Sequence, residues 1–369
     1  MNLANRQKLI VILGTTSSGK TALARELCKE FDGYIISADS RQVYRYMDIG
    51  TGKADTVSEL LDMHKQREVL DRLCKHTPDS RFYILNSISH YMIDIVKPSQ
   101  EYNVVLYQRD VYNLLSSKLK AQSAKPQRKT QIFSIPFLVG GTGQYIDAVV
   151  DNWQFPEGEP NDALRREIEE RVKTEGLEVL WEELTARDPE CAQFVQKENP
   201  RRVARALEYV LSTGKKFSTG RRKGERRFDV LKIGISLPRE ELYKKIDARV
   251  FRRLAVGMVE EVWELHTKHR LSFERLRQFG LEYRIIGEWL KKFKTKNLKL
   301  KTTGKNKTLI LYSMKEMSQI DGYQDMVQKL KWAIHDYARR QLTWFRRDKE
   351  VRWVSCPEDA SRFVGRFIL

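Results

Sequence analysis

Short, continuous apolar runs alternate along this chain of 369 residues with stretches whose apolar residues recur at helical spacing. The runs are Leu9–Leu13, Tyr34–Ala38, Ile132–Val139 and Val230–Ser236. Their length and continuity are typical of strands buried on both faces, as in a parallel sheet. Residues Thr21–Phe31, between the first two runs, have the spacing of an amphipathic helix. The pattern therefore predicts an α/β fold with a mostly parallel sheet flanked by helices.

Residues 156–228 show the helical pattern alone. Their apolar positions fall on three predicted helix faces: Leu164, Ile168 and Val172; Leu177, Leu180, Trp181 and Leu184; Val203, Leu207, Val210 and Leu211. Asn161 or Asp162 can cap the first of these helices. We predict a helical insertion domain at 156–228, within a core made of residues 1–155 and 229–369. The core has a helical C-terminal region that includes Leu242–Leu265 and Met326–Phe345, and Ser116–Thr130 and Lys291–Thr308 have the composition of charged linkers.

A glycine-rich loop follows the first predicted strand. Its residues Gly14, Thr15, Thr16, Ser17, Ser18, Gly19, Lys20 and Thr21 fit the phosphate-loop pattern G-x-x-x-x-G-K-[ST] at every fixed position. Backbone N–H groups of such a loop surround phosphate oxygens, and the positive end of the following helix adds to the attraction. Lys20 supplies a charge and Thr21 a hydroxyl suited to Mg²⁺. We therefore predict binding of a phosphorylated ligand together with magnesium.

Polar residues follow two other predicted strands. Asp39 ends the second strand and leads into Ser40, Arg41 and Gln42, while Thr142 lies in the Gly140–Tyr145 turn after the third. Ligands of doubly wound sheets collect at the carboxyl ends of strands, so we expect these turns to share a crevice with the phosphate loop. Asp39 could ligate metal or accept a proton from a nucleophile, or it could simply cap a turn. The amide of Gln42 could pair with an adenine edge.

The charge balance favours a polyanionic partner. The chain has 67 Lys and Arg residues against 49 Asp and Glu, a net charge of +18. Arg201 and Arg205 share one face of a predicted helix with Arg202 beside them, and Arg339–Arg347 interleaves arginines with Trp344 and Phe345, a mixture that suits RNA. A solvated surface and a packed core remain the alternatives for these clusters. Arg239 and Arg249, after the last strand, could reach a diphosphate.

Other sequence features indicate in which cell compartment the protein works. No apolar stretch approaches the roughly 18–20 residues of a membrane span, and the N-terminus lacks a signal-peptide pattern. The four cysteines, Cys28, Cys74, Cys191 and Cys356, are far apart, which argues against structural zinc or a disulfide framework. We expect a cytoplasmic protein without a membrane partner.

In their order, these motifs resemble those of the tRNA dimethylallyltransferases, also called tRNA isopentenyltransferases or the IPP transferase family. The resemblance spans nearly the whole chain. It rests on Gly14–Thr21, Asp39–Tyr44, Met47–Lys53, Ile88–His90, Ile93–Pro98, Val139–Tyr145, Pro200–Glu208, Thr213–Lys215, Phe279–Arg284 and Arg340–Phe345.

The resemblance implies transfer of a dimethylallyl group from dimethylallyl diphosphate to the exocyclic N6 amine of the adenosine 3′ of the anticodon, in tRNAs that read codons beginning with U. It implies a P-loop NTPase-like core, Mg²⁺ held by Thr21, and a helical insertion that grips the anticodon stem-loop. Asp39 would accept the amine proton. Lys20, Thr21 and an arginine, Arg249 in preference to Arg239, would stabilise the leaving diphosphate. Residues expected to contact tRNA are Asp39, Ser40, Arg41, Gln42, Thr142, Arg165, Arg201, Arg202, Arg205, Arg277, Gly280, Tyr283 and Arg284. We expect a monomer.

Some features depart from the family pattern. Thr15, Thr16 and Ser17 replace the commoner Pro-Thr-Ala, and the stretch from Asp55 to Asn86 is longer than usual. No zinc-finger extension follows the Trp344 motif, so we expect a bacterial-type enzyme.

Three rival interpretations use the same residues differently. A small-molecule kinase would use the phosphate loop for a nucleoside triphosphate and Asp39 as a base. An adenylate isopentenyltransferase would prenylate free AMP, ADP or ATP, with less need of positive surface. A non-enzymatic RNA-binding protein would not need Lys20, Thr21 and Asp39 around one crevice.

Overall fold

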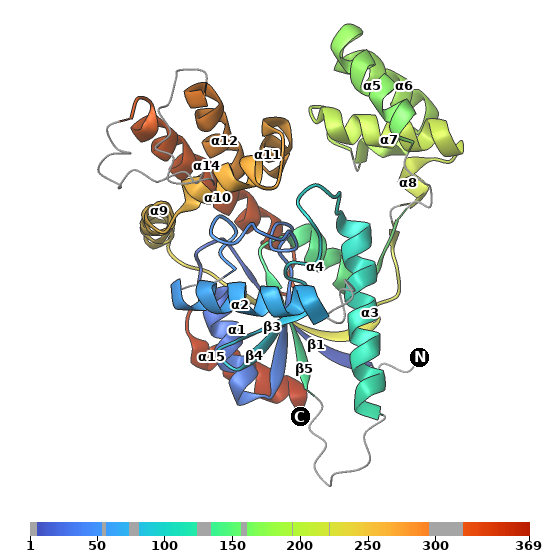
Figure 1. Ribbon diagram of the computed structural model, residues 1–369. Helices are drawn as coiled ribbons and strands as arrows, with labels where there is room; N and C mark the ends of the chain where they lie inside the picture. The colour runs from blue at the N-terminus through green and yellow to red at the C-terminus, as the bar shows by residue number, and fades with distance from the viewer. Residues whose placement is uncertain are drawn as a thin grey trace. The chain divides into compact units, whose positions relative to one another are not determined.

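The computed structural model describes residues 6–53, 57–73, 81–123, 134–155, 161–193, 195–220, 222–294 and 320–369. The chain forms two compact units (Figure 1). The larger contains residues Met1–Ile146 and Phe228–Leu369, and the smaller contains Asp147–Arg227. The smaller unit therefore begins nine residues before the predicted insertion and ends one residue before its predicted end.

A seven-stranded sheet forms the centre of the larger unit, in the order β3-β4-β2-β5-β1-β8-β9. The strands are β1 (Gln7–Gly14), β2 (Gly33–Ser37), β3 (Phe82–Leu85), β4 (Ile88–Tyr91), β5 (Ile135–Gly140), β8 (Phe228–Ile235) and β9 (Arg352–Val354). All neighbours pair in parallel except β3, which runs antiparallel to β4 at one edge. The predicted α/β fold with a mostly parallel sheet is confirmed.

Helices cover both faces of this sheet. On one face α1 (Lys20–Glu30) and α15 (Pro357–Ile368) bury Leu27 and Val364 against Ile10, Ile12 and Phe137. The helices α3 (Val104–Ser123) and α4 (Gly143–Val150) contact each other through stacked Tyr107 and Tyr145 rings. Figure 1 shows α3 on the opposite side of the sheet from α1 and α15. The central strands are thus buried on both faces, which is why they read as continuous apolar runs.

A second core of the larger unit lies among its C-terminal helices. These are α9 (Arg239–Ala255), α10 (Met258–Thr267), α11 (Phe273–Phe279), α12 (Leu281–Lys294) and α14 (Tyr323–Phe345). Their apolar faces enclose Val43, Tyr44 and Met47 from the segment that follows β2. This packing fixes the segment next to the carboxyl ends of the strands, where the predicted site residues lie.

The smaller unit is mostly helical, with α5 (Asp162–Thr174), α6 (Leu177–Arg187), the short 3-10 helix Pro189–Gln193, α7 (Pro200–Thr213) and α8 (Phe217–Gly220). Its core is formed by Ile168, Leu180, Leu184, Val203, Leu207 and Val210 among others. These residues come from all three predicted helix faces, Ile168 from the first and the others from the second and third. Asn161 caps α5 by accepting a hydrogen bond from the Leu164 N–H at 3.0 Å.

Several predictions about elements were wrong. Two short strands, β6 (Trp153–Gln154) and β7 (Arg222–Lys223), pair within the smaller unit, where we expected helices alone. Residues 116–123 belong to α3, so the first predicted linker begins later than expected, and residues 124–130 lie outside the described residues. Residues 291–294 of the second predicted linker belong to α12, and its residues 295–308 also lie outside the described residues. The amphipathic stretch Leu242–Leu265 is divided at Gly257, whose φ of 104° ends one helix and begins the next.

Within the described residues, no helix is long and apolar enough to cross a membrane.

Candidate active site

The phosphate loop connects β1 to α1. Gly14 lies so close to β8 that a Cβ there would be 2.9 Å from the Ile235 carbonyl oxygen. Ser17 and Gly19 have φ angles of 62° and 93°, which turn the chain into the first residue of α1, Lys20. Within the described part of the chain, the buried hydroxyls of Ser17 and Ser18 have no hydrogen-bond partner. A phosphate group would satisfy them, since its oxygens accept from hydroxyls.

Two cations approach this loop. Lys20 donates to the Thr15 carbonyl oxygen, and Arg249 Nη1 of α9 donates to Thr16 Oγ1 at 3.3 Å. Loss of hydration, with the nearby Arg249 charge as a second cause, lowers the pKa of Lys20 to about 7, and the Asp39 carboxylate opposes the shift. An anionic ligand would relieve the repulsion between the two cations. Lys20, Arg249 and Asp39 therefore lie close together at the phosphate loop, as the sequence predicted.

Asp39 lies in the turn after β2. Its Oδ1 accepts the Arg41 N–H at 2.8 Å, and the neighbouring Ser40 N–H donates to Thr142 Oγ1 at 3.0 Å. Gly140 makes this approach possible, because a Cβ there would lie 2.1 Å from the Ala38 carbonyl oxygen. The Asp39 turn and the Gly140–Tyr145 turn therefore lie in direct contact within the larger unit, as expected of turns at the carboxyl ends of neighbouring strands.

Arg41 and Gln42 are engaged within the chain. Arg41 Nε donates to the Phe279 carbonyl oxygen at 2.6 Å, which links this turn to the end of α11. Gln42 accepts from Ser37 Oγ at 2.7 Å and donates to the carbonyl oxygens of Thr51 and Gly52 at 3.3 and 3.2 Å. These bonds occupy both ends of the Gln42 amide, so pairing with a base edge would require them to break.

A pocket opens beside the phosphate loop. It is lined by Thr16, Asp39, Arg41, Gly50, Thr51, Arg253, Leu281, Glu282, Ile334 and Tyr337. Its lining combines polar groups, the Asp39 carboxylate and the Arg253–Glu282 ion pair at 2.9 Å, with the apolar side chains of Leu281 and Ile334. Leu281 has a φ of 40°, a conformation that non-glycine residues rarely adopt and that is often associated with functional sites. The pocket can accept a ligand with a charged end and an apolar part.

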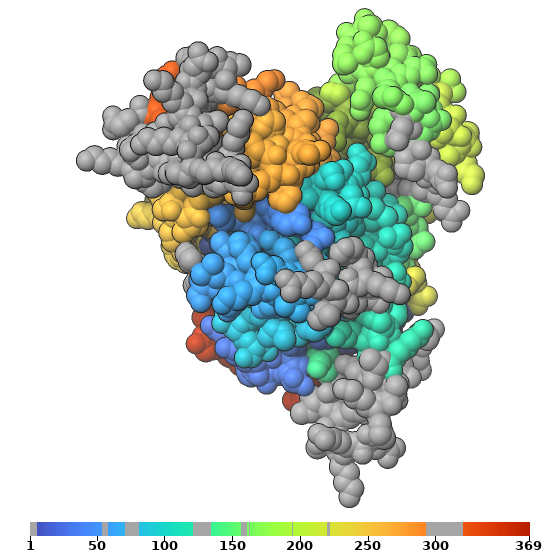
Figure 2. Space-filling view, in the orientation of Figure 1, coloured from blue at the N-terminus to red at the C-terminus, as the bar shows by residue number. Residues whose placement is uncertain are grey.

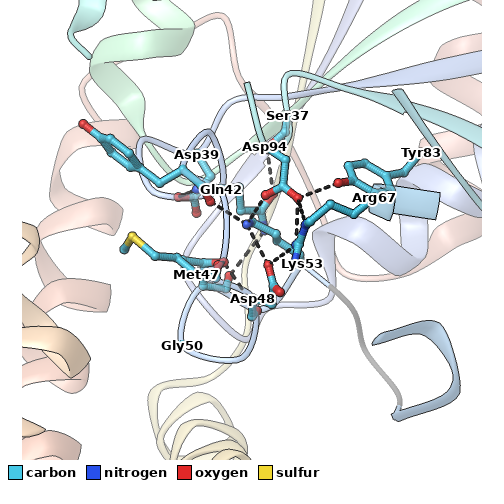
Figure 3. Close-up of polar contacts among 12 residues, drawn as sticks. Ser37, Asp39, Gln42, Met47, Asp48, Gly50, Lys53, Arg67, Tyr83 and Asp94 are labelled. Carbon is cyan, nitrogen blue, oxygen red and sulfur yellow. Dashed lines mark hydrogen bonds and ion pairs between the residues drawn. The ribbon is translucent and has the colours of Figure 1, made fainter. Parts of the chain in front are cut away.

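Buried charges hold one wall of this pocket (Figure 3). Lys53 contacts Asp94 and lies 2.9 Å from Asp48 Oδ1, while Arg67 contacts Asp94 Oδ2 at 2.7 Å and Asp48 Oδ1 at 2.6 Å. We call Asp48, Lys53, Arg67 and Asp94 the buried ion cluster. Burial alone would raise the pKa of Asp48, but Lys53, His64 and Arg67 hold it well below its usual range. On the other side, Glu261 accepts the backbone N–H groups of residues 48, 49 and 50 at 2.6–3.0 Å.

Arg67 belongs to α2 (Val57–Leu73), which lies within the stretch from Asp55 to Asn86. Figure 2 shows this helix at the surface of the larger unit, where Leu61 and Val69 are exposed. The arginine nevertheless extends into the buried ion cluster. Helix α2 is therefore attached to the pocket wall through Arg67 and through His64, whose Nε2 lies 3.1 Å from Asp48 Oδ2.

Of the remaining predicted residues of the larger unit, the arginines other than Arg249 are exposed at the surface, whereas Gly280 and Tyr283 lie close to the pocket wall. Arg239 is exposed, with its guanidinium 5.2 Å from the Tyr243 ring centroid, so Arg249 is the arginine at the loop. Arg277 and Arg284 are exposed, and Gly280, with a φ of 71°, lies next to Arg41. Tyr283 is fully buried and donates to Glu261 Oε1 at 2.8 Å, so its side chain supports the wall from inside.

In the smaller unit, Arg201, Arg202 and Arg205 are exposed on α7, which Asn199 caps by accepting the Arg202 N–H at 3.2 Å. Arg165 instead forms an ion pair with Glu208 at 2.9 Å. Three of these four predicted contacts therefore present their charge to solvent.

Sequence reasoning missed several residues of the site. Arg253 lines the pocket and donates to the Gly50 carbonyl oxygen at 2.8 Å; it follows Arg249 by one helical turn, a spacing that could have revealed it. Gln341 donates to the Gly141 carbonyl oxygen and accepts the Thr16 N–H, whereas the pattern of its motif indicates only RNA binding or core packing. Lys53 had no signal beyond its motif, because a buried lysine is rare.

The residues beside the phosphate loop supply only some of the oxygen ligands that a magnesium ion needs. Thr21 is the second residue of α1 and is partly exposed beside the loop. Among the described residues, no group of three or more His, Cys, Asp or Glu side chains could hold a metal ion. A magnesium ion here would therefore rely on Thr21, water and ligand phosphates, which is how Mg²⁺ is commonly held beside phosphates.

The fold and the site define a P-loop α/β protein with a carboxylate pocket beside its phosphate loop. The family model described as IPP transferase matches residues 75–348, and that described as isopentenyl transferase matches residues 7–73. The chain belongs to the IPP transferase family.

Relatives and solved structures agree with this. A tRNA dimethylallyltransferase of Halothermothrix orenii is 36% identical over 350 residues, 94% of this chain and 87% of the relative. One of Thermomicrobium roseum is 34% identical over 96% of this chain and 88% of its own length. The structure of the tRNA isopentenylpyrophosphate transferase of Bacillus halodurans is similar with a TM-score of 0.58 and 26% identity, over 98% of this chain and 97% of that one. A eukaryotic dimethylallyltransferase shares the fold, with a TM-score of 0.61 and 22% identity over 92% of this chain and 70% of the other.

Proposed function

We propose that this protein transfers a dimethylallyl group from dimethylallyl diphosphate to the N6 amine of the adenosine 3′ of the anticodon in tRNA. The carbon–oxygen bond to diphosphate breaks, a carbon–nitrogen bond to N6 forms, and the amine loses a proton. The observation that carries the proposal is the pocket in which Asp39 and apolar side chains lie directly beside the phosphate loop.

The phosphate loop, Lys20 and Arg249 would bind the diphosphate and stabilise its charge as it leaves. Both cations lie at the loop, and burial together with the Arg249 charge lowers the pKa of Lys20, an effect that a bound diphosphate would offset. Positive groups held in place where charge develops lower the barrier most when they need no reorganisation. Bound Mg²⁺, held by Thr21 and the phosphates, would supply further electrostatic stabilisation of the leaving group.

Asp39 would orient the amine and accept its proton. Its Oδ1 is fixed by the Arg41 N–H, so the carboxylate is held in the pocket by its own turn. A nucleophile must lie within hydrogen-bond reach of its base, and an adenosine in a tRNA loop must leave its stack to do so.

The helical unit would bind tRNA through the exposed arginines of α7. Arginine guanidinium groups pair with phosphates, and the net charge of +18 adds attraction at long range. Arg277 and Arg284, which are also exposed, would contact tRNA from the larger unit. We propose further that the enzyme acts as a monomer, and that it works in the cytoplasm because its substrate is tRNA.

The test is incubation of the purified protein with dimethylallyl diphosphate, Mg²⁺ and unmodified tRNA, followed by mass analysis of the digested nucleosides. We expect a prenylated adenosine from tRNA and none from free AMP or ATP. Prenylation of the free nucleotide alone would assign the protein to cytokinin synthesis. Consumption of ATP without a prenyl product would identify a kinase or ATPase.

Substitution of Asp39 tests the mechanism. Asp39→Asn should slow transfer by about 10²–10⁴-fold, the usual contribution of a general base, while tRNA binding in a filter assay stays close to wild type. Asp336→Asn, an exposed aspartate on α14, is the matched control and should leave the rate unchanged. Transfer by Asp39→Asn at the wild-type rate would exclude Asp39 as the base.

A further inference from the structure

Gln341 joins two loops that come from opposite ends of the sequence. The side chain comes from α14 and is 6% exposed. Its Oε1 accepts the Thr16 N–H of the phosphate loop at 2.8 Å, and its Nε2 donates to the Gly141 carbonyl oxygen at 2.8 Å. One amide group thus bridges the turn after β1 and the turn after β5.

The neighbouring glycines show how closely α14 approaches. A Cβ at Gly141 would lie 2.2 Å from Gln341 Nε2, and one at Gly143 would lie 2.3 Å from Trp344 Cδ1. A side chain at Gly141 would displace the Gln341 amide from its hydrogen bonds, and one at Gly143 would clash with the Trp344 ring. Tyr337, one helical turn before Gln341, lines the pocket. The face of α14 formed by Tyr337, Gln341 and Trp344 therefore packs on the turn after β5 and forms part of the pocket.

A path made of hydrogen bonds and short pieces of backbone runs through Gln341. On one side Thr16 holds Arg249 through its hydroxyl, at 3.3 Å. On the other side Gly141 precedes Thr142, whose Oγ1 accepts the Ser40 N–H at 3.0 Å. Ser40 follows Asp39 directly in the chain. The amide therefore connects the groups that hold the diphosphate to the turn that holds the carboxylate.

We propose that Gln341 is a positioning residue that sets the separation between the phosphate loop and the Asp39 turn. The proposal rests on the proposed function, because it assigns the two sides of the pocket to the diphosphate and to the amine. In-line attack demands a narrow range of distances between donor carbon and nucleophile, and a misplacement of about 1 Å can cost about 10²-fold in rate. A glutamine is suited to this role, since its amide donates at one end and accepts at the other.

The first experiment removes both hydrogen bonds while keeping the length of the side chain. Gln341→Met should slow single-turnover prenyl transfer at saturating substrates by about 10–100-fold. It should also weaken binding of inorganic diphosphate by about 5-fold, the usual effect of one lost hydrogen bond. A single-turnover rate constant does not depend on the fraction of active molecules, so simple loss of folded protein would not change it. Thr343→Ala is the control: its hydroxyl donates to the Arg339 carbonyl oxygen of its own helix at 3.0 Å.

A second variant gives a signature that a merely structural role would not. Gln341→Glu has the same shape, and its protonated carboxyl both donates and accepts as the amide does, whereas its ionised form cannot donate to Gly141. The ratio of its single-turnover rate to the wild-type rate should therefore rise as the pH falls from 8 to 5.5. Dividing by the wild-type rate cancels the pH dependence that the two proteins share. The same ratio for Gln341→Met should stay flat.

The outcomes separate the two proposals. Rates and diphosphate affinities of Gln341→Met within twofold of wild type would overturn the role of Gln341. A flat ratio for Gln341→Glu would also overturn it. If the wild-type protein prenylates no tRNA while Gln341→Met still weakens diphosphate binding about 5-fold, the proposed function fails and the effect of Gln341 on the phosphate loop stands.

Discussion

Replacing Lys53 by methionine should strongly destabilise the larger unit. The Lys53 side chain is completely buried, and its ammonium contacts Asp48, Asp94 and, at 2.6 Å, the Tyr44 carbonyl oxygen. Lys53 and Arg67 neutralise Asp48 and Asp94, so the buried ion cluster has no net charge. The substitution leaves two buried carboxylates facing one guanidinium and the half-exposed ring of His64.

The cost follows from the burial of the partners. The side chains of Asp48 and Asp94 are 6% and 0% exposed, so water cannot replace the lost ammonium. Breaking a buried ion pair by removing one partner costs about 3–5 kcal/mol of unfolding free energy. Adding Asp94→Asn restores the charge balance of the cluster. The double variant should therefore be more stable than the sum of the two single effects predicts.

Urea denaturation followed by circular dichroism would measure the loss, and hydrogen exchange of peptides that cover residues 44–53 would locate it. Lys268→Met is the matched control, because Lys268 forms an exposed pair with Glu264 on α10 and its loss should cost at most about 0.5 kcal/mol. A cost below about 1 kcal/mol for Lys53→Met would refute the reasoning, since it would mean that the two carboxylates are solvated or protonated without penalty. Strict additivity with Asp94→Asn would refute it as well.

Three further predictions concern other parts of the molecule. The folded-state pKa of Lys20 is lowered from 10.5 to about 7, so the unfolded chain binds more protons between these values and stability should rise with pH across this window. Urea denaturation of wild type and Lys20→Met would give the difference between their unfolding free energies at each pH. This difference should shift in favour of wild type by about 2 kcal/mol between pH 7 and 9 and stay constant below pH 6. A constant difference at every pH would contradict the lowered pKa. Gly140→Ala places a Cβ 2.1 Å from the Ala38 carbonyl oxygen and should lower the unfolding free energy by about 1–3 kcal/mol, whereas Gly365→Ala, whose nearest neighbour is 3.9 Å away, should not destabilise in the same assay. Replacing Arg201, Arg202 and Arg205 together by glutamine should reduce the slope of log K against log salt concentration for tRNA binding by about 2–3, and an unchanged slope would mean that these arginines do not contact phosphates.

The parts of the fold that were predicted correctly have local signals. The four apolar runs became β1, β2, β5 and β8, because strands buried on both faces must be apolar throughout. The strands that were missed, β3, β4 and β9, are three or four residues long and lie towards the sheet edges, where burial is incomplete and the apolar pattern is interrupted. The short pair β6–β7 has two residues in each strand, too few to show any period.

For the site, the sequence by itself determined the chemistry near the phosphates. The spacing of Gly14, Gly19, Lys20 and Thr21 and the position of Asp39 at a strand end required nothing beyond local geometry and the rule that parallel strands present their carboxyl ends together. Family membership also followed from the order of short motifs. These signals are local because each motif folds as one turn between two adjacent elements.

Only the tertiary structure decided which distant residues complete the site. It turned the Gln42 amide towards the chain's own carbonyl oxygens, buried Tyr283 and brought Gln341 between two loops. It also placed Arg67, from a surface helix, in the buried ion cluster. The physical reason is that a hydrogen bond or ion pair needs two groups within about 3 Å in the right orientation. Residues hundreds of positions apart in the chain meet that condition only after the sheet and the C-terminal helices have packed.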